Sequence, residues 1–296
     1  MFHTGSIATV FGLFALLAGP TENAAPVSKS WALCAASTTV VTGTLHVPVR
    51  ELRAAHGSAG RYLNATVDVS EVLKGERSQA LTVSFFSVDE SYAPKSGALI
   101  ALDGKPVVLF LTAEPDPDAP ARLKSYFAGY SPDAVRARSE PELTEIRAEI
   151  TRQARVLREW RPHPEWPHEP AVKELIAKTL VRETAARAFT DLEHLGPDAV
   201  PAIADLMDDR RALGAGHIVL ENGRGGFESH RIYAPHLVVD ALAAILNQIT
   251  GRSFDSISNG GSEQQRQHAV DGWRIYADMQ QNHALPRPGR SSGTPR

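Results

Sequence analysis

The chain has 296 residues, of which 43% are hydrophobic and 22% are charged, and its formal net charge at pH 7 is -3. This balance is enough for one large or two moderate cores, and it excludes a disordered chain or a bundle of membrane helices. A slightly acidic protein has no basic excess to neutralise phosphates, so we expect no nucleic acid partner. The single cysteine, Cys34, excludes an internal disulfide framework and a zinc site built from four cysteines.

The N-terminus carries a short apolar run, IATVFGLFALLA, at residues 7–18. The run is uncharged and shorter than the roughly 20 residues that cross a bilayer. Small residues follow it at Ala24 and Ala25. The pattern predicts a signal peptide over residues 1–25, cleaved near Ala24 or Ala25, and a periplasmic or secreted protein with no membrane span. A buried or interfacial N-terminal helix is the open alternative.

Residues 31–135 are predicted to form a β-rich domain. Leu63, Ala65 and Val67 alternate with polar residues, as in a strand with one buried face, whereas the run PVVLFLT at 106–112 is typical of a strand buried on both sides. The dipeptide Asp103-Gly104 suits a tight hairpin between two strands. The expected strands are residues 38–49, 61–73, 79–87, 98–102, 106–112 and 124–130.

So many short antiparallel strands expose less edge if they close, which favours a small five-stranded antiparallel β-barrel. The order of the segments VVTG, VLKG, LTVSF and VVLFL resembles small OB-fold-like domains of secreted bacterial proteins related to netrin and tissue-inhibitor-of-metalloproteinase modules. The resemblance implies an OB-like barrel over about residues 38–130. It also implies an inhibitor or ligand-binding barrel as one alternative function.

Residues 140–282 are predicted to form a helical domain. Its first helix, residues 140–160, is amphipathic, and its charges are interpreted as a solvated face. A proline-rich connector, RPHPEWPHEP at 161–170, ends this helix and is expected to pack against Trp160 and Trp166. The connector holds four residues that can ligate metals, but its prolines block the helical H-E-x-x-H geometry, so we predict no metal site. These residues are His163, Glu165, His168 and Glu169.

Residues 183–209 read as a helical hairpin with two apolar faces. Gly196 and Pro197 form its turn, and Pro201 fits the first turn of the second helix. The segment Leu195-Gly196, the run AVPA at 199–202 and the run DDRR at 208–211 resemble a HEAT repeat. Later segments, LNQITG, NGGS and GWRIY, resemble the C-terminal half of uncharacterised secreted bacterial HEAT-like proteins. The predicted fold is therefore α+β with two domains, the second a HEAT-like helical domain.

An insertion at residues 213–233 interrupts the helices. Ile218 to Leu220 and residues 227–233 are expected to pair as a β-hairpin. About twenty residues exceed what a helix connection needs, which favours a binding function, although a structural cap on the repeat stack is an equal alternative. A hydrolase site near the insertion is a further alternative. Its first candidates are His217, Glu221 and His230, with Glu228 and Arg231 nearby.

The remaining helices are expected at residues 235–249 and 262–282, the second opened by a capping box of Ser262 and Gln265. The tail at 283–296 is predicted to be disordered. No nucleophile elbow, phosphate-binding loop or dinucleotide fingerprint is present, so we assign no catalytic, cofactor-binding or metal residues. The sequence thus predicts an exported, non-catalytic interaction or scaffold module with an unknown protein partner.

Overall fold

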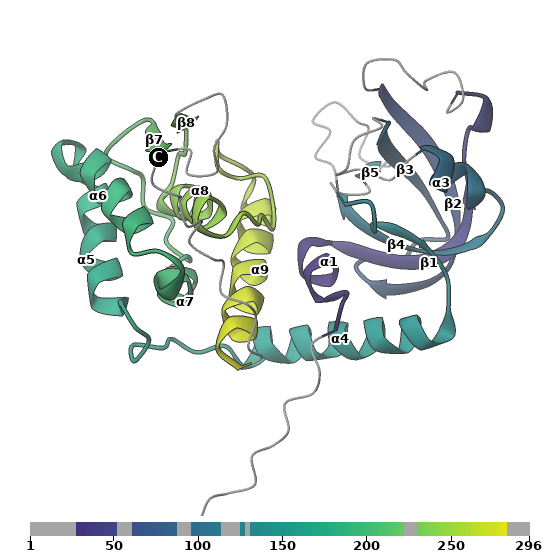
Figure 1. Ribbon diagram of the computed structural model, residues 1–296, viewed down its shortest axis with the longest axis horizontal. Coiled ribbons are helices and arrows are strands. Elements are labelled where there is room, and N and C mark those ends of the chain that lie inside the picture. Colours follow the sequence, from purple (N-terminus) through teal and green to yellow (C-terminus); the bar gives the residue numbers. More distant parts are fainter. Residues whose placement is uncertain are drawn as a thin grey trace, which may run out of the picture.

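The computed structural model describes residues 28–51, 61–87, 96–113, 125–127, 131–221 and 230–282. The fold is mixed α+β, with a curled sheet on one side, a group of helices on the other, and the long helix α4 running along both (Figure 1). The predicted signal peptide and the predicted disordered tail lie outside the described residues. No helix within the described ranges is long and apolar enough to cross a membrane.

The curled sheet has the strand order β1-β2-β3-β5-β4-β6, and β4 also pairs with β1. Every pair is antiparallel except β3 with β5, which is parallel. The expectation of purely antiparallel strands is therefore wrong at this pair. The pairings run in a cycle of five strands, and an odd cycle cannot alternate direction at every step. The strands are β1 (Thr39–His46), β2 (Arg61–Lys74), β3 (Ala80–Ser87), β4 (Pro106–Ala113), β5 (Ser125–Phe127) and β6 (Val135–Ala137).

Strand β4 is buried on both faces, as its continuous apolar sequence predicts. Leu109 and its alternate neighbours pack in the cluster inside the curled sheet. Val108 and Phe110 instead pack with Leu143 and Ile146 of α4 (Glu140–Glu159) in a second, smaller cluster. The alternation of side chains along a strand thus ties the sheet to α4.

Residues 98–101 of the segment 98–102, which was predicted as a strand, belong to helix α3 (Ser96–Ala101). Its buried residue Leu99 still packs into the sheet cluster. The amides of Leu102 and Lys105 donate to Leu99 O and Leu102 O, so Asp103 and Gly104 lie in a turn between a helix and β4 rather than in a hairpin. A short apolar run does not distinguish a buried helix from a buried strand, which is why the prediction was wrong.

The helical part contains most of the predicted helices. Gly196 and Gly251 have positive φ values of 71° and 74°, as expected at helix ends, and Ser262 and Gln265 form the reciprocal capping bonds. Ile203 and Leu242 are fully buried in the core of this part. The elements here are α5 (Glu169–Thr179), α6 (Arg182–His194), η1 (Pro197–Ala199), α7 (Val200–Asp205), α8 (Val238–Thr250) and α9 (Glu263–Asn282), with the hairpin strands β7 (Ile218–Glu221) and β8 (His230–Tyr233).

Helix α1 (Trp31–Ala36) was not predicted from the sequence. It lies between the sheet, α4 and α9 (Figure 1). The interpretation of the α4 charges as a solvated face is also wrong in part, because the charged residue Glu149 is buried, together with the neutral polar residue Gln153. Both side chains face α1, so the polar residues of α4 help to join the parts of the molecule.

Candidate functional site

The insertion is closed at its base by backbone contacts. Ala212 and Leu237 form an antiparallel bridge, and the amide of Gly214 donates to Thr179 O at 3.0 Å. A Cβ on Gly214 would lie 2.7 Å from both Leu180 O and Arg182 N. Only glycine allows the chain to pass this close to the turn between α5 and α6, so the base of the insertion is held in one place.

The hairpin has one face in the core and one face outward. Ile218 and Leu220 of β7 are buried and belong to the helical cluster. Val219 lies between them on the other face and pairs with Ile232 of β8. These two side chains are 44% and 71% exposed, and they are two of the three exposed large hydrophobic residues in the described ranges. The outward face, which we define by Val219 and Ile232, is therefore apolar and uncovered.

Four of the hydrolase candidates, His217, Glu221, His230 and Arg231, lie in or next to the strands of this hairpin. Glu221 and His230 are directly paired across the two strands, whereas His217 lies before the opposite end of β7. Four residues of extended chain span about 13 Å, which is the approximate backbone separation of His217 and Glu221. Arg231 pairs with Leu220, on the other face from His230. Residues 222–229, which include Glu228 and the start of the predicted strand at 227–233, lie outside the described residues.

The connector after α4 is packed down by aromatic rings, as predicted. Trp160 and Trp166 meet edge to face with centroids 5.6 Å apart, and His163 stacks on Trp166 at 4.3 Å. The Trp160 indole donates to Asp205 Oδ1 at 3.1 Å. His163 Nδ1 lies 3.0 Å from Glu165 Oε1, and this hydrogen bond holds the pKa of Glu165 below its usual value.

The other two metal-competent residues of the connector have separate roles. His168 has a left-handed backbone, with φ of 69°, at the start of α5. Glu169 is buried and pairs with Lys173 one turn along the helix. Within the described parts of the chain, no three His, Cys, Asp or Glu side chains gather closely enough to hold a metal ion.

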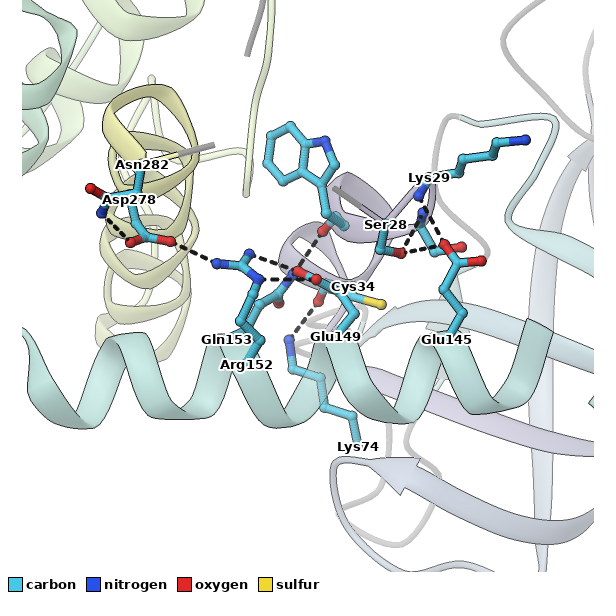
Figure 2. Close-up of polar contacts among 12 residues, drawn as sticks. Ser28, Lys29, Cys34, Lys74, Glu145, Glu149, Arg152, Gln153, Asp278 and Asn282 are labelled. Carbon is cyan, nitrogen blue, oxygen red and sulfur yellow. Dashed lines mark hydrogen bonds and ion pairs between the residues drawn. The ribbon is translucent and has the colours of Figure 1, made fainter. Parts of the chain in front are cut away.

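A polar junction, formed by α1, α4 and α9, is the feature that sequence analysis missed (Figure 2). Arg152 of α4 binds Glu149 with two hydrogen bonds, at 2.7 and 3.0 Å, and donates to Asp278 of α9 at 2.6 Å. Burial alone would lower the pKa of the Arg152 guanidinium, but Glu149 and Asp278 raise it. Gln153 donates to Trp31 O at 2.8 Å and to Glu149 Oε1 at 2.7 Å.

A trace of this junction is present in the sequence. Glu149 and Gln153 follow Ile146 at steps of three and four, so they continue the apolar face of α4 rather than its charged face. Their partner helix α1 gives no such signal, because six residues are too few to show a period.

The junction also holds the single cysteine. Cys34 is fully buried, and burial, followed by the nearby Glu149 charge, raises the pKa of its thiol to about 12. Lys74 of β2 donates to Cys34 O at 2.7 Å, and burial lowers the pKa of this lysine. The thiol is therefore protonated and covered, which fits a packing role.

No protein family model, no curated protein and no solved structure matches this chain, so the case for function rests on its own residues and their contacts.

Proposed function

We propose that this is an exported, non-catalytic interaction protein that binds a protein partner through the outward face of its β7–β8 hairpin. The exposed pair of Val219 and Ile232 is the observation that carries the proposal. Ile218 and Leu220, which flank Val219 on β7, are buried. The hairpin is therefore held in place by one face and exposes the other face to solvent. A cap whose only purpose was to cover helix ends would need no apolar side chains on its outer face.

The binding free energy expected from covering this pair is modest, but it is enough to anchor a complex. Fully covering a valine or isoleucine side chain stabilises a complex by about 1.5 to 3 kcal/mol. An apolar pair at the centre of an interface, surrounded by polar groups, is a typical anchor. His217 and His230 are exposed, and each lies two residues before one member of the pair, His217 before Val219 and His230 before Ile232, so they are well placed for the polar rim.

The test compares three purified proteins as baits in a pull-down from the exported fraction of the native host. They are the wild type, Ile232→Lys, and the matched control Val181→Lys. Val181 is the third exposed large hydrophobic residue in the described ranges, 49% exposed, and it lies outside the hairpin. We expect a partner that is retained by the wild type and by the control and lost by Ile232→Lys. Retention of every partner by Ile232→Lys would contradict the proposal.

The finer architecture belongs to the same proposal. The cycle of pairings through β1, β2, β3, β5 and β4, with a helix between β3 and β4, supports an OB-like barrel as the first of two domains. The α6–α7 hairpin, with Gly196 and Pro201 at the expected positions, supports a HEAT-like second domain.

Export is proposed from the apolar run at residues 7–18 and the small residues after it. N-terminal sequencing of the protein from the exported fraction should find a new terminus near Ala24 or Ala25. An intact Met1 on cytoplasmic protein would contradict export.

A further inference from the structure

Residues 28–37, at the start of the described chain, contact both the sheet and the helices, and we call this segment the strap. It contains helix α1, which has only six residues and no side-chain hydrogen bond at its N-terminal cap. An isolated helix of this length is unstable in water. The strap is therefore held in its helical form by the surfaces on which it lies.

The apolar contacts of the strap reach two different clusters. The Trp31 ring packs against Tyr276 and Phe254 of the helical cluster, at 6.0 and 6.5 Å between centroids. The guanidinium of Arg252 lies 5.2 Å from the centre of the same ring. Cys34, three residues later, belongs to the small cluster between the sheet and α4. The strap thus places side chains in both parts.

The polar contacts of the strap come from elements distant in sequence. Gln153 of α4 donates to Trp31 O, and Lys74 of β2 donates to Cys34 O. At the start of the strap, Glu145 accepts from Ser28 Oγ at 2.7 Å and from Lys29 N at 2.9 Å (Figure 2). All of these are side-chain bonds that water can replace one by one if the strap leaves.

Two features of the docked state favour such opening. The two larger clusters consist mostly of residues outside the strap. The cluster inside the sheet contains none of its residues, and the helical cluster includes only Trp31, Ala35 and neighbouring alanines from it. In addition, Gln153 Oε1 is buried with no hydrogen-bond partner in the described part of the chain. An orphaned buried acceptor weakens the closed state relative to a hydrated one.

We propose that the strap is a clasp, which opens as a local unit while both larger cores stay folded. In the open state, α4 and the Arg152–Asp278 ion pair are left to connect the sheet to the helices, and the two parts can change their relative orientation about α4. The strap therefore regulates how rigidly the two parts are held.

Cys34 provides the probe, because it is the only cysteine in the sequence and is fully covered when the strap is docked. The rate of its modification by N-ethylmaleimide, followed by mass spectrometry under native conditions, measures how often the strap opens. The wild type is compared with Trp31→Ala, which weakens the strap, and with Ile203→Ala, which weakens the helical core at a residue of α7, outside the strap.

Local opening predicts a modification rate that is raised at least about a hundredfold in Trp31→Ala, which is the lower end of the effect expected when a buried tryptophan is truncated. The same rate should stay within about threefold of wild type in Ile203→Ala, although that variant unfolds at lower urea. Circular dichroism checks that both variants fold. If modification instead requires global unfolding, the two variants rise together, and the proposal fails.

A second measurement uses the wild type alone and decides the question even if Trp31→Ala does not fold. Its modification rate is recorded at urea concentrations below the unfolding transition. A local opening exposes little surface, so the rate should change little with urea. If the logarithm of the modification rate instead rises with urea as steeply as the equilibrium constant for global unfolding, the proposal is wrong.

Discussion

The buried ion pair between Asp240 of α8 and Arg266 of α9 offers a sharp test of how the helical part is held together. Asp240 is 0% exposed, and its carboxylate accepts from Arg266 Nε at 2.7 Å and Arg266 Nη2 at 3.0 Å. The same carboxylate accepts from the amides of His236 and Leu237 at 3.1 and 3.0 Å, so it also satisfies the start of α8. The hydrogen bond from Arg266 to Asp240 raises the pKa of the Arg266 guanidinium.

The perturbation is Asp240→Asn, which keeps the shape and one acceptor oxygen but removes the charge. Arg266, whose side chain is only 11% exposed, is then left without its counter-charge. Breaking a buried pair from one side costs about 3 to 5 kcal/mol. With a urea dependence of about 3 kcal/mol/M, the unfolding midpoint should fall by about 1 to 1.7 M.

The matched control is Asp191→Asn, which removes one partner of the exposed Arg187–Asp191 pair on α6. An exposed pair of this kind contributes at most about 1 kcal/mol. Urea unfolding followed by circular dichroism measures all three proteins. Equal midpoints for the two variants would refute the reasoning, because they would mean that burial of the pair has no energetic consequence.

The packing supports three further predictions. Ile203→Ala should lower the free energy of unfolding by about 2 to 5 kcal/mol, because Ile203 is fully buried, and a change below about 0.5 kcal/mol would mean that its face is misassigned. Gly214→Ala should cost about 1 to 3 kcal/mol through its clash with backbone atoms, whereas Gly216→Ala, whose Cβ would meet nothing within 4 Å, should be nearly neutral; thermal unfolding compares them. The Cys34 thiol has an ordinary pKa of 9.0 when the chain is unfolded and a pKa of about 12 when it is folded, so its burial favours the folded state below pH 9 and this advantage is lost as pH rises toward the folded pKa. The stability gap between wild type and Cys34→Ala should therefore narrow by about 2 kcal/mol from about pH 8 to about pH 10.5, and a constant gap in urea unfolding would contradict the raised pKa.

The sequence by itself determined the elements whose pattern repeats over enough residues. The alternation in residues 63–70 and the 3.6-residue period of the later helices are local consequences of backbone geometry, so they can be recognised before any partner is known. Helix ends at Gly251 and at Ser262 were equally readable, because a positive φ and a capping box are local requirements. The continuous apolar run of β4 even predicted burial on both faces.

Only the tertiary structure decided the features that depend on contacts between distant segments. Helix α1 is too short to form alone and exists because Trp31 and Cys34 find partners in two separate clusters. The outward position of Ile232 could not be read from the sequence. Its partner strand β7 is apolar at three successive residues, so only the packing of β7 on α6 and α8 decides which face of the hairpin is buried. Periodicity shows that a face will be buried; the surface that covers it is set by the rest of the chain.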